Sequence, residues 1–350
     1  MNVVRLGDVP VGAGEPPYVI AEVGSNHNGD MDLCRRLIDA AAGAGAHAVK
    51  FQSWSEASLI AREEYERNPA YSDKKKHFGS LREMVKAYQF TPEMHREANE
   101  YCRTRGIRFC SSVFSPEEAD LLESLDVPFY KIASMDVVNL PLLDYVGRKG
   151  RPVLISTGMA TLAEIERAVE AVRHAGNEQT VLLHCVSIYP PDYEMLHLRN
   201  IKTLNRAFDV PVGFSDHTLG TAISLAAIAV GAAVIEKHFT LDKDMPGWDH
   251  AVSADPAEMR VIVSEGKHIF TALGSRHRIV TEAELVKRRS FRRSLVARRA
   301  LSKGHVITAS DLDAKRPGTG IGPDERDYVV GRTLNRDVGE DELIRWKDLQ

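Results

Sequence analysis

Polar and charged residues recur at the ends of short apolar segments over the first 240 residues of the chain. Eight such segments can be recognised, and every one of them carries or is followed by side chains able to take part in chemistry. These are Glu22, Asn26 and His27; Lys50 and Gln52; Ser111 and Ser112; Lys131, Ser134 and Asp136; Ser156 and Thr157; His184, Ser187 and Tyr189; Ser215, Asp216 and His217; Glu236, Lys237 and His238. A core with a purely structural role is not expected to place polar groups at the same end of eight segments, so the pattern indicates an enzyme.

Two histidines in this set are candidates for metal binding. His217 and His238 lie at the ends of consecutive apolar segments, which brings their imidazoles close together if the segments are neighbouring strands. Two neutral imidazoles, with Glu22 or Glu236 nearby, suit a divalent transition metal. The alternative is a pair of hydrogen-bonded histidines without a metal, and spacing alone does not decide between the two.

Two lysines lie inside apolar segments. An unpaired ammonium group is costly to bury, so Lys50 and Lys131 require an anion, either a protein carboxylate or a substrate phosphate or carboxylate. Ser112, Ser134, Ser156 and Ser215 end the same set of segments and favour the substrate anion, although small serines could also simply fill space. The sequence contains no HExxH or CxxC metal motif, and no Ser-His-Asp arrangement can be argued from it.

The elements that position these residues alternate between strands and helices. Eight short strands rich in Val, Ile and Phe are predicted at 18–23, 46–52, 108–114, 129–134, 152–157, 180–186, 211–215 and 234–239. Helices are predicted between them, for example at 32–44, 162–175 and 219–230, with Asp30, Thr161 and Thr218 as N-caps. This order predicts an α/β fold, a closed (β/α)₈ TIM barrel. An open doubly wound sheet would require a glycine-rich phosphate loop after its first strand, and AEVGSNHNG does not match one.

The composition changes after the barrel. We expect a barrel domain at residues 1–274, a basic linker at 275–293 and a small β-rich domain at 294–350. The net charge of −4 gives no general basis for binding nucleic acid, and no apolar run approaches the roughly 20 residues of a membrane helix. The N-terminus lacks the pattern of a secretion signal, and the four cysteines are scattered. A cytoplasmic protein with free thiols is expected.

Eight motifs in order resemble one family. AEVGSNHNG, KFQSW, KIAS, ISTGM, LHCVSIYP, GFSDHT, EKHFTLDKDMPG and KRPGTG resemble the sialic acid (N-acetylneuraminate) synthases, a family that includes legionaminic and pseudaminic acid synthases. The resemblance extends from about residue 18 to residue 349. It implies a TIM barrel followed by a small antifreeze-like (SAF) domain, and a homodimer in which that domain covers the partner's active site.

The resemblance also implies the reaction. A transferase of this family condenses phosphoenolpyruvate with an N-acyl amino hexose, releasing phosphate and forming a nonulosonic acid. The implied metal ligands are His217 and His238, with Mn²⁺ as the expected ion and Mg²⁺ or Co²⁺ as alternatives. Phosphoenolpyruvate would be held by Lys50, Ser112, Lys131, Ser134, Ser156, Ser187 and Ser215. The sugar would contact Glu22, Gln52, Tyr189, Asp249 and Arg316. The expected catalytic residues are Glu22, Lys50, Lys131 and Asp216.

Two departures leave the sugar undetermined. Ser187 stands where the sialate-forming enzymes typically have Asn, and Trp248 adds a bulky aromatic side chain just before Asp249. N-acetylmannosamine and the 2,4-diacetamido hexoses are both candidates. A condensing enzyme of the octulosonate or heptulosonate phosphate type, which uses a phosphorylated acceptor, is the nearest alternative function. A non-catalytic sugar-binding barrel and a metal-dependent hydrolase fit the sequence less well. KRPGTG could be only a turn, but Arg316 as a lid residue is the favoured interpretation.

Overall fold

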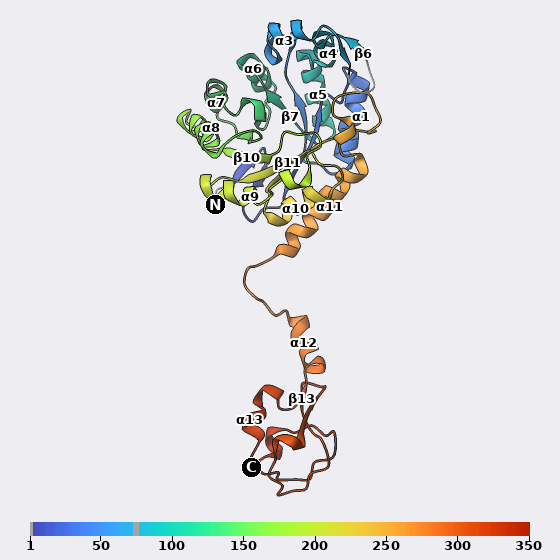
Figure 1. The fold of residues 1–350 in the computed structure, drawn as a ribbon, viewed down its shortest axis with the longest axis vertical. Helices are drawn as coiled ribbons and strands as arrows, with labels where there is room; N and C mark the ends of the chain where they lie inside the picture. Colours follow the sequence, from blue (N-terminus) through green and yellow to red (C-terminus); the bar gives the residue numbers. More distant parts are fainter. Residues whose placement is uncertain (1–2, 73–76) are drawn as a thin grey trace. The chain divides into compact units, whose positions relative to one another are not determined.

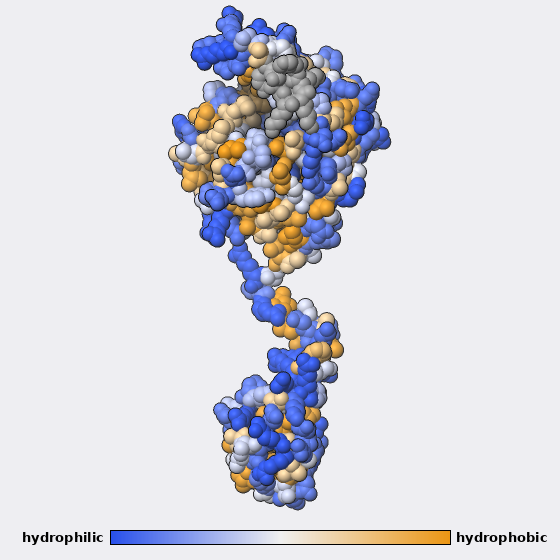
Figure 2. Space-filling view, turned by 45° about the vertical axis from the view of Figure 1, so that its right-hand side comes forward, coloured by the Kyte–Doolittle hydropathy of each residue, from blue (hydrophilic) through white to orange (hydrophobic). Residues whose placement is uncertain are grey.

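The computed structural model describes residues 3–72 and 77–350 (Figure 1). The chain divides into two compact units, one extending to Gly274 and the other from Ser275 to Gln350. On the face drawn in Figure 2, hydrophilic and hydrophobic residues are interspersed over both units. Within the described part of the chain, no helix has both the length and the apolar character needed to cross a membrane.

The N-terminal unit contains a closed barrel of eight parallel strands. They are β3 (Tyr18–Gly24), β4 (Ala48–Gln52), β7 (Arg108–Val113), β8 (Tyr130–Ile132), β9 (Val153–Ser156), β10 (Thr180–Cys185), β11 (Val212–Asp216) and β12 (Val234–His238). Each strand pairs with the next along the chain, and β12 closes the ring on β3. The predicted (β/α)₈ barrel is therefore confirmed, with each strand close to its expected position.

Helices cover the outside of the barrel. They are α1 (Met31–Gly43), α5 (Pro92–Thr104), α6 (Pro116–Ser124), α7 (Leu140–Gly147), α8 (Leu162–His174), α9 (Asn200–Phe208), α10 (Ala222–Val230) and α11 (Pro256–Leu273). Asp30 and Thr161 cap α1 and α8 through their side chains, as predicted. The cap predicted at Thr218 is wrong, because α10 begins only at Ala222. The Thr218 hydroxyl instead donates to the carboxylate of Asp216 at 2.8 Å.

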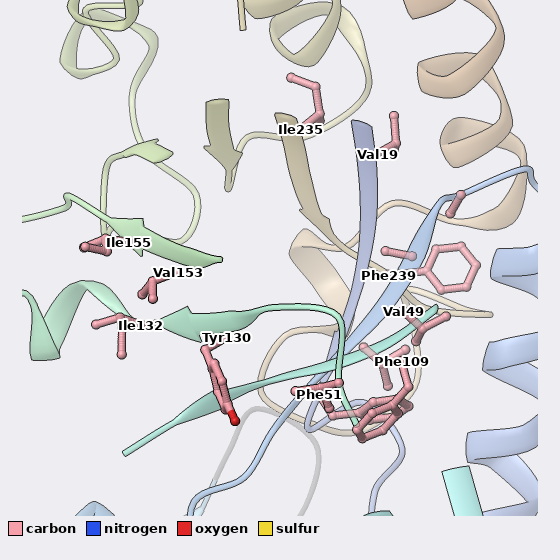
Figure 3. Close-up of a cluster of buried hydrophobic side chains, with 14 of the residues drawn as sticks. Val19, Val49, Phe51, Phe109, Tyr130, Ile132, Val153, Ile155, Ile235 and Phe239 are labelled. Carbon is pink, nitrogen blue, oxygen red and sulfur yellow. The ribbon is translucent and has the colours of Figure 1, made fainter. Parts of the chain in front are cut away.

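The strands alternate between two cores with a period of two residues. Figure 3 shows one core, in which Val19, Val49, Phe109 and other residues pack between the strands and the helices. The alternate residues, such as Tyr18 and Ile20, point into the barrel and form a separate cluster. A side chain's position in a strand therefore decides whether it faces the barrel interior or the helices.

An N-terminal hairpin closes one end of the barrel. It consists of β1 (Val4–Leu6) and β2 (Val9–Val11), which pair antiparallel. Val4, Leu6 and Val11 are buried in the same cluster as the inward-facing barrel residues. The hairpin therefore seals the N-terminal end of the barrel, which leaves the opposite end open for a site. The sequence analysis did not predict it, because its strands are only three residues long.

A long excursion separates β4 from α5. It contains α2 (Glu56–Leu59), α3 (Arg62–Arg67), β5 (Tyr71–Ser72), β6 (His77–Gly79) and α4 (Leu81–Tyr88). Ser80 and Glu83 form a capping box at the start of α4, which fixes where the helix begins. The excursion has its own apolar cluster, built around Trp54, Met84 and Tyr88. It is thus a small packed layer attached to the barrel rather than an open loop.

The C-terminal unit has its own core. It contains α12 (Glu282–Phe291), β13 (Ser294–Ala297), β14 (Leu312–Lys315) and α13 (Arg326–Val329), and β13 pairs antiparallel with β14. Leu295, Ile307, Leu312 and Ile344 are among the residues of its apolar cluster. The segment expected to be a linker, residues 275–293, groups with this unit and contains α12.

Short 3₁₀ turns occur in both units: Ser134–Asp136, Tyr193–Met195, His250–Val252, Ala309–Asp311, Pro323–Glu325 and Trp346–Asp348.

The close packing inside the barrel generates a prediction at Gly213. A Cβ atom there would lie 2.5 Å from the carbonyl oxygen of Val234 and 2.7 Å from Cδ2 of Leu183. Neither neighbour can retreat easily, because both belong to adjacent barrel strands. We expect Gly213→Ala to lower the free energy of unfolding by about 1–3 kcal/mol, measured by urea denaturation.

Gly43→Ala is the matched control. Gly43 ends α1, and a Cβ atom added there meets nothing within 4 Å. Alanine also favours the helix over glycine, so stability should stay equal or rise slightly. Equal stability of the two variants would contradict the packing argument.

Candidate active site

The open end of the barrel contains a cavity of about 550 Å³. Most of its polar lining comes from the inward-facing residues at the C-terminal ends of the strands and from the loops that follow them. These lining residues are Glu22, Lys50, Gln52, Ser112, Lys131, Ser134, Ser156, Ser187, Tyr189, Ser215, His217, Glu236 and His238. The structure therefore brings together twelve of the residues that were predicted to form a site, and it adds Glu236.

Four charged side chains form a network at the bottom of the cavity. Lys50 Nζ lies 2.6 Å from Glu22 Oε2 and 3.9 Å from Glu236 Oε2, and Lys131 Nζ lies 3.9 Å from Glu236 Oε1. All four are buried, and their formal charges cancel. The partner expected for each lysine was either a protein carboxylate or a substrate anion, and the structure contains the carboxylates. These pairs account for the burial of the lysines, and a substrate anion remains a prediction.

Serine hydroxyls complete this network. Lys50 donates a hydrogen bond to Ser112 Oγ at 3.1 Å, and Ser215 Oγ donates to Glu236 Oε1 at 3.0 Å. Lys131 donates to the backbone carbonyl of Ile132 at 2.9 Å. The serines are therefore more than space-filling residues, because they satisfy buried charged groups.

The two carboxylates differ in their affinity for protons. Burial raises the pKa of Glu22 to about 7, although Lys50 acts in the opposite direction. Burial also acts to raise the pKa of Glu236, but Lys131 and Lys50 outweigh this effect and hold that pKa below its usual value. Glu22 is therefore the carboxylate that can exchange a proton near neutral pH, while Glu236 stays anionic.

A chain of hydrogen bonds orients Glu22. The indole Nε1 of Trp54 donates to Gln52 Oε1 at 3.0 Å, and Gln52 Nε2 donates to Glu22 Oε1 at 2.9 Å. Since an indole N–H can only donate, it fixes which end of the Gln52 amide faces Glu22. Lys50 contacts the other oxygen of Glu22, so both carboxylate oxygens have a defined partner.

The donor set at His217 and His238 fits a divalent ion. Their ring centroids are 5.5 Å apart, close enough for one ion to bond to both imidazoles. His217 Nδ1 donates to the carbonyl of Val186 at 3.0 Å, so in the neutral imidazole Nε2 carries the lone pair. Burial acts to lower the pKa of His217, but Cys185 and the Val186 carbonyl outweigh it and hold that pKa above its usual value, so a metal would have to displace a proton there. His238 Nδ1 is buried without a hydrogen-bond partner, and Asp249 Oδ2 lies 3.8 Å from it.

The protonation of His238 agrees with this fit. Burial and the neighbouring His217 hold the pKa of His238 well below its usual value, so the imidazole is neutral and able to bind a metal. Among the described residues, no cluster of three or more His, Cys, Asp or Glu side chains is arranged to hold a metal. An ion at the two histidines would therefore keep open positions for water or substrate.

The turn after β9 approaches two of the serines closely. The backbone N–H of Gly158 donates to Ser134 Oγ at 3.1 Å. A Cβ atom at residue 158 would lie 2.3 Å from Ser187 Oγ and 2.8 Å from Ser134 Oγ. Glycine in the ISTGM motif therefore lets the backbone approach two hydroxyls at one side of the cavity, and its N–H holds the Ser134 hydroxyl in place.

Three predicted site residues do not line the cavity. Asp216 faces the helices and is fully buried, and its carboxylate accepts hydrogen bonds from Lys237 at 2.9 Å and Ser224 at 2.5 Å. Its position supports a structural role rather than the catalytic role that we expected. Asp249 lies beside His238, and burial raises its pKa to about 6. Arg316 belongs to the C-terminal unit, where its guanidinium lies 4.7 Å from the ring of Phe291, and its contact with the sugar stays a prediction.

Glu236 has a larger part in the cavity than was predicted for it. It was considered only as a neighbour of the histidines, although the structure places it between both lysines. The period of two in β12 was a usable signal, because Glu236 and His238 must share one face while Lys237 takes the other. The apolar part of the cavity, which includes Leu59, Ile60 and Phe114, was not predicted, because its residues belong to no polar motif at a strand end.

The architecture and the site define a class of protein. A TIM barrel whose ionisable groups converge at the C-terminal end of its strands is an enzyme scaffold. The NeuB family model matches residues 37–278, and the SAF domain model matches residues 292–350. The chain belongs to the NeuB family, and its C-terminal unit contains a SAF domain. The predicted family is therefore confirmed, as is the prediction that the chain is an enzyme.

Several relatives match over nearly their whole length. The N,N'-diacetyllegionaminic acid synthase of Legionella pneumophila is 39% identical, with 98% of each chain covered. The human N-acetylneuraminate-9-phosphate synthase is 34% identical, with 95% of this chain and 93% of the relative covered. The crystal structure of the N-acetylneuraminic acid synthetase of Leptospira borgpetersenii has a TM-score of 0.73 at 32% identity, covering 82% of this chain and 95% of that one.

A more distant likeness concerns the fold alone. A truncated 3-deoxy-D-arabino-heptulosonate 7-phosphate synthase of Thermotoga maritima has a TM-score of 0.61 at 18% identity. It covers 78% of this chain and 93% of that one. The barrel is thus shared more widely than the family.

The buried pair of Asp216 and Lys237 generates a prediction about stability. Both side chains are inaccessible to solvent, so Asp216→Asn leaves the ammonium group of Lys237 buried without a countercharge. We expect the free energy of unfolding to fall by about 3–5 kcal/mol in urea denaturation. If the variant keeps its stability but loses its activity, Asp216 has a catalytic role instead.

Asp144→Asn provides the control for this measurement. Asp144 forms an exposed pair with Arg148 on α7, one helical turn away. Solvent screens that pair, so its loss should change stability very little.

Proposed function

We propose that this enzyme condenses phosphoenolpyruvate with an N-acyl amino hexose to form a nonulosonic acid and inorganic phosphate. The observation that carries the proposal is the joining of two buried lysines, two carboxylates and two imidazoles in one cavity at the mouth of the barrel. Membership of the NeuB family and the names of the relatives support it.

The polar lining suits phosphoenolpyruvate, which carries a phosphate and a carboxylate. Lys50 and Lys131 supply positive charge from adjacent parts of the cavity floor. The serines on the same floor can donate hydrogen bonds to the same anion. We assign Ser112, Ser134, Ser156, Ser187 and Ser215 to this subsite, with the two lysines stabilising the charge on the phosphate as it leaves.

The first chemical step joins the two substrates. C3 of phosphoenolpyruvate attacks the aldehyde carbon of the open-chain sugar, which leaves C2 with a positive charge, and the aldehyde oxygen takes up a proton from water. His217 and His238 would hold a divalent ion, with Mn²⁺ as our first choice, which would supply Lewis-acid assistance to the aldehyde. Gln52, Tyr189 and Asp249 lie in or beside the cavity, where they can orient the sugar.

The second step releases phosphate. Water adds at C2 of the former phosphoenolpyruvate, and Glu22 accepts the proton of that water. The C2 hydroxyl of the tetrahedral product then loses its proton as the C2–O bond to the phosphate breaks, which leaves a ketone at C2 and inorganic phosphate. Glu22 suits this role because burial raises its pKa to about 7 and the contacts with Gln52 and Lys50 fix its orientation.

The remaining assignments are also proposals. The SAF domain would cover the partner's barrel in a cytoplasmic homodimer, and Arg316 would contact the N-acyl group of the sugar. The alternative function is condensation with a phosphorylated aldose of the octulosonate or heptulosonate type. The chain's SAF domain argues against that alternative, because such a barrel does not need the additional module.

Phosphate release tests the reaction directly. With Mn²⁺ and phosphoenolpyruvate, the enzyme should release phosphate only when an N-acyl amino hexose is added, and EDTA should abolish the release. The acceptors are N-acetylmannosamine, its 6-phosphate, two 2,4-diacetamido hexoses, mannose and arabinose 5-phosphate. Release with arabinose 5-phosphate alone would favour the alternative function, and no release with any acceptor would contradict the proposal.

The pH dependence tests Glu22. As the pH falls through about 7, Glu22 takes up a proton and can no longer accept one from water, so kcat/KM should fall on the acidic side. Glu22→Gln should lower kcat by at least about 100-fold, since general base catalysis typically contributes that much. The exposed Glu117→Gln on α6 should leave both rate and pH profile unchanged. Full turnover by a folded Glu22→Gln enzyme would remove Glu22 from the mechanism.

A further inference from the structure

The first barrel strand is followed by polar residues that the proposed reaction does not use. Asn26 and His27 were among the residues that indicated chemistry, yet neither lines the cavity. Both are buried in the loop that joins β3 to α1, residues 25–30, which we call the first loop. We call the loop that joins β12 to α11, residues 239–255, the last loop. The two loops are neighbours, because β3 pairs with β12 where the barrel closes.

The last loop is closed at its base. The backbone N–H of Ala254 donates to the carbonyl of His238 at 2.7 Å, and the N–H of Thr240 donates to the carbonyl of Ala254 at 3.0 Å. The loop therefore leaves the barrel next to His238 and returns to the same place. Between these two points it carries Trp248, which lines the cavity, and Asp249, which lies beside His238.

Asn26 holds the last loop by its side-chain amide. Its Nδ2 donates to the carbonyl of Phe239 and to Ser253 Oγ, both at 2.9 Å. Ser253 Oγ in turn donates to the backbone carbonyl of Asp249 at 2.6 Å. Asn26 and Ser253 are both buried, so water cannot easily replace these bonds. Two consecutive hydrogen bonds thus connect the first loop to the backbone of Asp249.

The direction of these bonds requires an amide at residue 26. The carbonyls of Phe239 and Asp249 can only accept hydrogen bonds, and the single hydroxyl proton of Ser253 is used toward Asp249. Both remaining hydrogen bonds must therefore be donated by Asn26, and a carboxylate of the same shape could donate neither. Asn26 Oδ1 is buried and accepts no hydrogen bond, so the side chain is placed for its two donors.

Asn28 contacts the last loop on the other side of Asp249. Its Nδ2 donates to the carbonyl of Pro246 at 2.9 Å. A Cβ atom at Gly247 would lie 2.9 Å from Asn28 Oδ1, so the two loops are in close contact here. The first loop therefore holds the segment that carries Trp248 and Asp249 both before and after these residues.

The carboxylate of Asp249 has no anchor of its own. In the described part of the chain it accepts no hydrogen bond, and its contact with a charged or ionisable partner is the one between Oδ2 and His238 Nδ1, at 3.8 Å. Its place beside the histidine is therefore set by the backbone of the last loop. That backbone is held by the side chains of Asn26, Asn28 and Ser253.

We propose that Asn26, Asn28 and Ser253 are positioning residues, which act on the reaction by holding Asp249 beside His238. This inference rests on the proposed function, in which Asp249 orients the sugar and His238 helps to hold the metal ion. None of the three positioning side chains lines the cavity, so they act only through the last loop. A displacement of about 1 Å at a group that orients a substrate can slow a reaction by about 100-fold, so loosening the loop should have a measurable effect.

Ser253→Ala is the mildest test, because it removes one hydroxyl and leaves the bond between Asn26 and Phe239. In the full-length, Mn²⁺-loaded enzyme with the best acceptor of the panel, we expect kcat/KM for the acceptor to fall by about 10- to 100-fold. The KM for phosphoenolpyruvate should stay unchanged, because the last loop carries none of the residues that we assign to it. Asn28→Ala should have the same effect, and its partly exposed position keeps the cost in stability small.

A double-mutant cycle shows whether these effects pass through Asp249. Asp249→Asn should lower kcat/KM by itself. Ser253→Ala or Asn28→Ala added to it should cause little further loss, because the group that they position has already been changed. A residue with only a general structural role would instead reduce the rate by the same factor in both backgrounds.

Ser25→Ala is the matched control. Ser25 is a buried serine of the first loop whose hydroxyl has no hydrogen-bond partner, so its removal should leave both kinetic constants unchanged. Additive losses in the cycle, an unchanged rate in Asp249→Asn, or unchanged constants in both Ser253→Ala and Asn28→Ala would each overturn the inference. No phosphate release by the unmodified enzyme with any acceptor would contradict the proposed function instead.

Discussion

The strict alternation of side chains in a closed barrel governs the rest of this structure. Because each strand is covered by helices outside and by its neighbours' side chains inside, a residue has only two environments available. Glu236 and His238 therefore both face the cavity, whereas Lys237 between them points outward, toward the helices. The same rule separates Ser215 from Asp216. Catalytic and structural polar groups can thus be one residue apart.

The second constraint is electrostatic. Buried charges need partners, and the floor of the cavity satisfies this with two lysines and two carboxylates whose formal charges cancel. The two carboxylates differ in pKa. Glu236 lies near both ammonium groups, which hold its pKa down, whereas burial raises the pKa of Glu22 against the opposing effect of Lys50. One carboxylate is therefore kept anionic and the other is placed near its titration point at neutral pH. In the proposed reaction, the two lysines of this network supply the positive charge that binds an anionic substrate.

The open end of the barrel is shaped by segments outside the repeating pattern. The N-terminal hairpin fills the opposite end, which confines any site to the C-terminal ends of the strands. The excursion after β4 adds an apolar layer beside the polar floor, and Trp54 connects the two through its hydrogen bond to Gln52. Family membership follows from the strand-end motifs, whereas these additions lie where loops can vary without disturbing the barrel.

The sequence by itself determined the barrel, the family and nearly all the polar residues of the cavity, because apolar strands and their polar ends follow a local pattern. It did not separate Asp216 from the cavity or place Glu236 between Lys50 and Lys131, because pairing depends on strand register and on side-chain reach across the barrel. The cap at Thr218 was wrong because its hydroxyl donates to the side chain of Asp216, two residues earlier, and the helix begins only at Ala222. The apolar side of the cavity, which includes Trp54 and Trp248, was also a result of tertiary structure alone. Its residues come from segments as far apart as Trp54 and Trp248, and only packing of the excursion onto the barrel brings them to one surface.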